Sequence, residues 1–321
     1  MLRLRFYRYL ARHGTATASR RVKLLPFGLV LKYNPRRNGL IEADNTHFVA
    51  DHTRIPVPQI LDIIPFSEYN EQLCAMLMTR IEGQPLDQWL FAGHVIRPPG
   101  SAELIEEMKM LMYSDTGSDA LLEVLAKIKN TPPPTVILSD CEGLIADLRA
   151  AFQELRSLPP PASGIVSGLS GRPVLSCRCG DTKPMGPCDQ QEFKDAIFAQ
   201  AGFQHRLPGL RRLAEPVNAK VHQVCFTHAD LAGRNVMVGK DGRVAGIVDW
   251  ETAGWHPEYW ERTMMEFQML HEPVMQQFWD AAQLFGPDAY EEELALEWAL
   301  WGCTGMTAVA NESGDDLSCP R

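Results

Sequence analysis

The sequence lacks the features that would place the chain in a membrane, secreted or nucleic-acid-binding class. No uninterrupted apolar run reaches about 18 residues, so we expect no transmembrane helix and no membrane partner. The net charge of -9 at pH 7 argues against binding to nucleic acid. The N-terminus has no apolar core of the kind a secretory signal needs. We therefore expect a cytoplasmic protein, whose 321 residues allow a large core.

The cysteines include no paired CxxC motif. They are scattered through the chain, so reduced thiols are the default for a large intracellular protein. The stretch "CRCGDTKPMGPC" gathers Cys177, Cys179 and Cys188, which leaves a zinc site open as an alternative. Because the spacing is not that of a zinc knuckle and no fourth ligand is evident, the sequence favours a thiol-containing loop.

Acidic residues are missing from the first part of the chain. Residues 1–41 contain ten Lys and Arg and no Asp or Glu, so the remainder carries -19, which is -9 minus 10. The Arg-rich stretch at 1–21 is typical of a mitochondrial transit peptide, which makes a mitochondrial location the alternative. Its alternating pattern also fits an edge strand followed by a turn. The acidic remainder favours cationic partners, although a solvated surface explains it as well.

Predicted strands come early in the chain, and predicted helices dominate its later part. The run "FGLVLKY" (27–33) indicates a strand that carries Lys32, and residues 39–53 have helical content with Glu42 in the first turn. "RIPVPQILDII" and "AMLMTR" indicate two further strands, and Glu82-Gly83 a turn. Helices are predicted over 144–158, 191–203, 257–272, 273–285 and 289–303. This order predicts an α+β fold with a small β-rich lobe and a larger, mainly helical lobe.

The same pattern predicts where the two lobes begin and end. The N-terminal lobe would span residues 1–82 and the C-terminal lobe residues 83–311, followed by a tail at 312–321. Residues 92–141 contain two helical stretches and read as an insertion in the second lobe.

One stretch carries a candidate for chemistry: "FTHADLAGRNVMVGKDGRVAGIVDWE" (226–251). "NVMV" and "VAGIVDW" are two short strands joined by the turn "GKDGR", which predicts a hairpin. Asn235 opens the first strand and Asp249 closes the second, so both lie at the open end of the hairpin, with Asp230 in the loop before it. Amide and carboxylate oxygens suit a hard divalent cation shared with phosphates. Asp230 is then placed to accept the proton of an attacking hydroxyl.

"HADLAGRN" followed by "IVDWE" resembles the catalytic loop and metal-binding segment of the aminoglycoside phosphotransferase family, which has a protein-kinase-like two-lobed fold. "GLVLKY", "IPVPQI", "TRIEGQPLDQWL", "LRSLPPP" and "DWETAGWHPEYWE" are similar to a fungal branch of that family. The resemblance implies an ATP- and Mg²⁺-dependent transfer of the γ-phosphoryl group to a hydroxyl of a small molecule. The acceptor would be an aminoglycoside-like sugar, a choline-like amino alcohol or another metabolite.

The resemblance also implies roles for single residues. Asp230 would be the catalytic carboxylate and His228 would brace its loop. Asn235 and Asp249 would bind Mg²⁺, and Lys32 would contact the α- and β-phosphates while Glu42 holds it by an ion pair. The backbone of Thr79, Arg80, Ile81 and Glu82 would meet the adenine.

The chain departs from the family pattern at two places. Ala229 stands where the family usually has glycine between the catalytic-loop histidine and aspartate, which matters if that residue needs a positive φ. Residues 12–21 offer the only candidate turn to cover the phosphates, and they contain a single glycine. A nucleotide-binding pseudokinase that acts as an interaction module is therefore the alternative. A protein kinase is disfavoured because no A-P-E-like motif follows Asp249.

The segment that follows the motif is rich in aromatic and acidic residues. We expect Trp255, Tyr259 and Trp260 to pack inside the helical lobe rather than bind a ligand. Its acids would either face a cationic acceptor or form a solvated face, namely Glu251, Glu258, Glu261 and Glu266.

Overall fold

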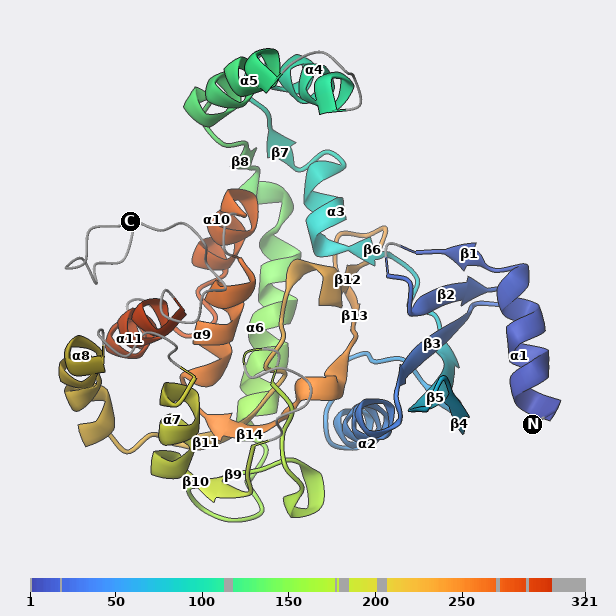
Figure 1. The fold of residues 1–321 in the computed structure, drawn as a ribbon, viewed down its shortest axis with the longest axis vertical. Helices are drawn as coiled ribbons and strands as arrows, with labels where there is room; N and C mark the ends of the chain where they lie inside the picture. The colour runs from blue at the N-terminus through green and yellow to red at the C-terminus, as the bar shows by residue number, and fades with distance from the viewer. Residues whose placement is uncertain are drawn as a thin grey trace.

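The computed structural model describes residues 2–17, 19–112, 118–176, 178, 185–200, 207–269, 272–286 and 289–301. It shows a β-sheet region built from the first part of the chain, beside a larger region made mainly of helices (Figure 1). Within the described residues, no helix is long and apolar enough to cross a membrane. The predicted α+β arrangement of a β-rich and a helical part is thus confirmed.

The N-terminal sheet is antiparallel, with strand order β1-β2-β3-β5-β4. Its central strand β3 lies between β2 and β5, and it places Lys32 opposite Val22 on one side and Met76 on the other. β5 has the longest buried run of the sheet, from Cys74 to Met78. The strands are β1 (Thr15–Ala16), β2 (Val22–Leu25), β3 (Leu29–Pro35), β4 (Ile60–Glu68) and β5 (Glu71–Thr79).

The Arg-rich N-terminus is a helix, α1 (Leu2–Arg12), so the prediction of an edge strand there was wrong. Its residues alternate in polarity, but they also repeat with helical spacing, and packing on the sheet decides between the two. Leu4 is buried in a cluster with Leu25, Leu31 and other sheet residues. Arg3 donates to Asp62 of β4 at 2.9 Å, so the helix is tied to the sheet by charge as well.

The helix between β3 and β4 is α2 (Arg36–His52), and it begins three residues before the predicted start. Pro35 precedes it with φ fixed near the helical value, which favours a helix start at the next residue. Glu42 therefore lies in the second turn, not in the first as predicted, and it is buried.

The chain crosses from the sheet to the helical part through the turn predicted at Glu82-Gly83. β6 (Gln84–Pro85) pairs with the later strand β12 (Val236–Val238), so this crossing is held by backbone hydrogen bonds. Gly83 has φ +148°, and a Cβ there would lie 2.4 Å from the carbonyl oxygen of Val238. Only glycine fits so close to another backbone. α3 (Leu86–Phe91) follows directly.

The main core of the helical part surrounds α6 (Glu142–Ser157), as the amphipathic pattern predicted. Leu144 and Leu148 are fully buried there with Phe226, Trp250 and Phe278. The helices after α6 are α7 (Gln190–Phe198), α8 (Leu207–Ala219), α9 (Trp260–Gln268), α10 (Pro273–Ala282) and α11 (Glu291–Trp301).

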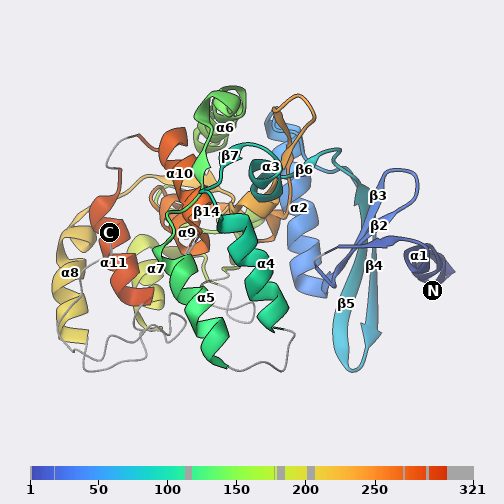
Figure 2. The same cartoon turned by 90° about the horizontal axis from the view of Figure 1, so that it is seen from above.

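Residues 92–141 contain the two predicted helices, α4 (Ser101–Met112) and α5 (Ser118–Asn130). They lie side by side and extend away from the rest of the helical part (Figures 1 and 2). Two short strands, β7 (Val95–Ile96) and β8 (Thr135–Val136), pair at the base of this helical hairpin.

The helix predicted over 257–272 starts only at Trp260, because the preceding residues form β14 (Gly254–Pro257). β14 pairs with β11 (Val224–Thr227), and short strands β9 (Ile165–Val166) and β10 (Cys188–Asp189) lie beside it. Trp255, Tyr259 and Trp260 are all buried, which confirms that they pack inside. Cys177, Cys179 and the predicted tail at 312–321 lie outside the described residues.

Candidate active site

The hairpin predicted in the motif is present and fixes the positions of its polar residues. β12 (Val236–Val238) pairs with β13 (Val244–Ile247), with Val236 opposite Ile247. The N–H of Val248 donates to the carbonyl oxygen of Asn235 at 2.9 Å. Asn235 and the residue after Val248, Asp249, therefore lie at the same open end of the hairpin.

Asp230 lies in the loop before the hairpin, and four polar contacts surround its carboxylate. Arg234 Nη2 is 3.1 Å from both carboxylate oxygens, and Asn235 Nδ2 is 3.1 Å from Oδ2. Gln268 of α9 donates to Oδ1. Burial raises the pKa of Asp230 to about 6, against the opposing charge of Arg234. A carboxylate with a raised pKa is a better proton acceptor near neutral pH than an ordinary one.

His228 is fully buried and braces the loop from inside. Its Nε2 is 3.0 Å from the carbonyl oxygen of Val248, which adjoins Asp249. Its Nδ1 accepts from the N–H of Asp230 at 3.3 Å. Burial lowers the pKa of His228, which favours the neutral ring that these two bonds require. The histidine thus connects the Asp230 loop to the Asp249 segment.

A buried carboxylate that sequence reasoning assigned elsewhere holds the start of the loop. Glu261 of α9 accepts from the N–H groups of His228 at 2.6 Å and Ala229 at 3.1 Å. It is 1% exposed, so the prediction that it faces an acceptor or solvent was wrong. Ala229 has φ +62°, the left-handed conformation that glycine would adopt without strain. The two hydrogen bonds to Glu261 stabilise the loop in this conformation.

Lys32 of β3 joins the sheet region to the Asp249 segment. Its Nζ lies 2.9 Å from Glu42 Oε1 and 2.7 Å from Asp249 Oδ1. Burial by itself would lower the pKa of Lys32, but the charges of Glu42 and Asp249 raise it above its ordinary value. Asn34 donates to the second Glu42 oxygen at 2.7 Å and fixes that carboxylate. The ion pair between Lys32 and Glu42 is therefore present.

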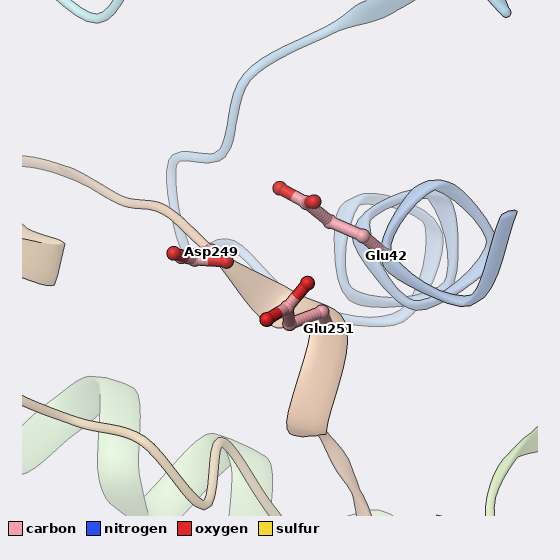
Figure 3. Close-up of side chains that lie close together, drawn as sticks. All are labelled: Glu42, Asp249 and Glu251. Carbon is pink, nitrogen blue, oxygen red and sulfur yellow. The ribbon is translucent and has the colours of Figure 1, made fainter. Parts of the chain in front are cut away.

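Three carboxylates gather beside this lysine. Glu42 comes from α2, and Asp249 and Glu251 come from the segment after β13 (Figure 3). One oxygen of each lies within 4.8 Å of the others. Asn235 Nδ2 points to Asp230, so its Oδ1 is left for a cation, and no described residue donates to that oxygen. An amide oxygen and carboxylates are the ligands that Mg²⁺ prefers, so the residues fit this ion.

The four residues expected to meet an adenine form the end of β5 and the crossing to β6. The N–H of Thr79 is bonded to Gln59, and the N–H of Arg80 to Gly28. Ile81 lies against the backbone of Gly246, where a Cβ would be 3.1 Å from the Ile81 side chain. Ile81 and Glu82 lie between these hydrogen-bonded residues and β6.

The other acids of this region are also paired internally. Glu266 lies against Arg262, and Glu258 lies 3.6 Å from Arg156. Glu266 is 5% exposed, so it does not form a solvated face. Burial raises the pKa of Glu266, and Arg262 opposes that effect.

A family model described as the phosphotransferase enzyme family matches residues 20–292, which include most of the sheet, the hairpin and most of the helical part. The chain belongs to this family. It is therefore a phosphotransferase, and nothing in the comparisons supports a pseudokinase. A comparison with curated proteins finds no match.

Solved structures with a similar arrangement have low sequence identity to this phosphotransferase. Aminoglycoside phosphotransferase APH(3'')-Id from Streptomyces rimosus is 15% identical with a TM-score of 0.49, over 95% of this chain and 99% of that chain. The macrolide 2'-phosphotransferase MphH from Brachybacterium faecium is 13% identical with a TM-score of 0.43, over 88% and 81%. At these values the neighbours fix neither the nucleotide nor the acceptor.

Sequence reasoning missed several residues of the site in this phosphotransferase. Arg234 and Gln268 contact Asp230, Asn34 contacts Glu42, and Asn45 of α2 donates to Trp250 and Ala253. Arg234 lies inside the quoted motif, four residues after Asp230. Its closeness in sequence could have indicated a contact with that carboxylate. Asn34, Asn45 and Gln268 are far from the motif in sequence, and no local pattern marks them.

Proposed function

We propose that this phosphotransferase transfers the γ-phosphoryl group of ATP, together with Mg²⁺, to a hydroxyl group of a small molecule. The observation that carries the proposal is the contact of one partly buried lysine, Lys32, with both Glu42 and Asp249. This contact joins the sheet to the open end of the hairpin, which also holds Asn235. A cation and an anionic phosphate chain both find complementary charge there.

The reaction needs positioning and charge neutralisation more than covalent catalysis. The acceptor oxygen forms a bond to the γ-phosphorus, and the bond to the bridging oxygen breaks, with its electron pair leaving on the nucleoside diphosphate. The hydroxyl proton passes to a carboxylate oxygen of Asp230. Lys32 would bind the α- and β-phosphates when it leaves Asp249, while Glu42 keeps it in place.

The metal would be held by Asn235 Oδ1 and Asp249, with Glu42 and Glu251 close by. Bound Mg²⁺ supplies positive charge that neutralises the phosphate oxygens. The adenine would lie against Ile81 and Glu82, with Thr79 and Arg80 forming the end of the strand above it.

The acceptor is proposed at the level of chemical class. An aminoglycoside-like sugar, a choline-like amino alcohol or another hydroxylated metabolite meets the requirement for a reacting hydroxyl. Glu261 and Glu266 were two of the acids expected to contact a cationic acceptor. Both have partners inside the protein instead. The motifs "GLVLKY" and "TRIEGQPLDQWL" support a place in the fungal branch of the family.

Thermal unfolding with and without ATP and Mg²⁺ tests the proposal directly. A ligand that binds only the folded protein raises its stability by about 2.7 kcal/mol at a hundredfold excess over its dissociation constant. We expect a rise in the unfolding midpoint that needs both ATP and Mg²⁺. Asp249→Asn should lose the metal-dependent part, because it removes one carboxylate charge without changing the shape of the side chain.

Asp62→Asn is the matched control, since Asp62 is a carboxylate on β4 that pairs with Arg3, away from Lys32. It should keep the metal-dependent rise. No rise in the unaltered protein, or an equal rise in Asp249→Asn, would overturn the proposal.

A further inference from the structure

The carboxylate of Asp230 is fully occupied by hydrogen-bond donors. An ionised carboxylate has about four lone-pair positions. Oδ1 receives Arg234 Nη2 and Gln268 Nε2, and Oδ2 receives Arg234 Nη2 and Asn235 Nδ2. An incoming hydroxyl therefore finds no free position and must displace a donor.

The three donors differ in how readily they can leave. Asn235 is buried, and its Nδ2 is also bonded to the carbonyl oxygen of Asp230 at 2.8 Å. Arg234 has a side chain that is 51% exposed, so its guanidinium can move into solvent. Arg234 is in turn held by Gln268, whose Oε1 lies 3.2 Å from both Nη1 and Nη2. Arg234 and Gln268 thus cover Asp230 as one hydrogen-bonded unit.

We propose that Arg234 and Gln268 form a latch over Asp230 that an acceptor opens and water does not. This inference rests on the proposed phosphoryl transfer. It adds a physical reason why the enzyme would select an acceptor over water. A bound acceptor contributes contacts elsewhere in the site, and their free energy offsets the loss of the Arg234 contacts. Water has no such contacts, so the latch stays closed and ATP is not hydrolysed wastefully.

The latch also constrains the acceptor. When Arg234 leaves Asp230, its half-exposed guanidinium is still close to the reacting hydroxyl and can donate to an oxygen of the acceptor. A hydroxyl, ether or carboxylate oxygen beside the reacting hydroxyl can accept that bond. An ammonium group at the same position would be repelled by the guanidinium.

ATP hydrolysis without any added acceptor tests the latch. Arg234→Gln removes the charge, and Gln268→Ala removes the group that holds Arg234. We expect phosphate release to rise roughly tenfold in each, because one hydrogen bond to a charged group no longer blocks the carboxylate. Arg243→Gln is the control and should keep the unaltered rate, since Arg243 pairs with Asp147 at the hairpin turn.

A second measurement does not depend on turnover. Carbodiimide labelling of Asp230, followed by mass spectrometry, should increase in Arg234→Gln and Gln268→Ala and not in Arg243→Gln. Lower hydrolysis together with unchanged labelling would overturn the latch, because Arg234 would then support Asp230 rather than cover it. If ATP does not raise the unfolding midpoint of the unaltered protein, the proposed function is refuted instead. The labelling experiment still tests the latch in that case.

Discussion

Ala229 adopts φ +62° in the loop that carries Asp230, where the family usually has glycine. This conformation destabilises a non-glycine residue by about 1–2 kcal/mol. Glycine adopts it without strain but loses about 0.5–1 kcal/mol more conformational entropy on folding. We expect Ala229→Gly to leave stability unchanged or raise it by up to about 1 kcal/mol. The free energy of unfolding in urea measures this.

Ala232 of the same loop is the matched control, since it is buried and has φ −103°. Ala232→Gly should destabilise by about 0.5–1 kcal/mol because no strain is relieved. Equal destabilisation by both substitutions would show that Ala229 is not strained.

At the scale of elements, α2 is fixed to the Asp249 segment by one side chain. Asn45 Nδ2 donates to the carbonyl oxygens of Trp250 at 2.8 Å and Ala253 at 3.0 Å, and the side chain is 1% exposed. Asn45→Ala would leave two buried carbonyl groups without this donor. We expect a loss of about 1–3 kcal/mol of stability and weaker ATP binding, measured by urea unfolding and by titration calorimetry.

Asn38 lies on the same helix and is also buried, but its Nδ2 meets no hydrogen-bond partner in the part of the chain that the structure describes. Asn38→Ala should therefore cost less than Asn45→Ala and leave ATP binding unchanged. If the two substitutions weaken ATP binding equally, the contact of Asn45 does not position the site.

Elements were the features that the sequence predicted best. The strand with Lys32, the hairpin and α6 follow from apolar periodicity and turn residues, which act over a few neighbouring positions. α1 was missed because its residues fit both an alternating and a helical pattern, and the sheet surface selects the helix. β14 was missed because its pairing with β11 joins residues about thirty positions apart.

At the scale of the whole molecule, one buried histidine makes stability depend on pH. His256 is fully buried, and burial lowers its pKa to about 4, while Thr227 Oγ1 lies 2.7 Å from its Nδ1. An unfolded histidine has a pKa of about 6.5, so the unfolded chain binds the proton more tightly. The stability due to neutral His256 is complete above about pH 6.5 and is lost as the pH falls through about 4. We expect this group to contribute about 3 kcal/mol to that loss.

Urea unfolding at a series of pH values measures the effect. His256→Gln should flatten the dependence between pH 7 and pH 4. His52→Gln, at an exposed histidine, should keep the full dependence. An unchanged slope in His256→Gln would assign the pH dependence to other groups.

The sequence by itself determined the family, the hairpin, and the residue types needed for phosphoryl transfer, because these are encoded in contiguous motifs. Only the tertiary structure decided which groups meet: Glu261 beneath the loop, Arg234 and Gln268 over Asp230, and Lys32 between Glu42 and Asp249. The physical reason is that a polar side chain must find a partner when the core excludes water, and that partner is chosen by packing of segments distant in sequence.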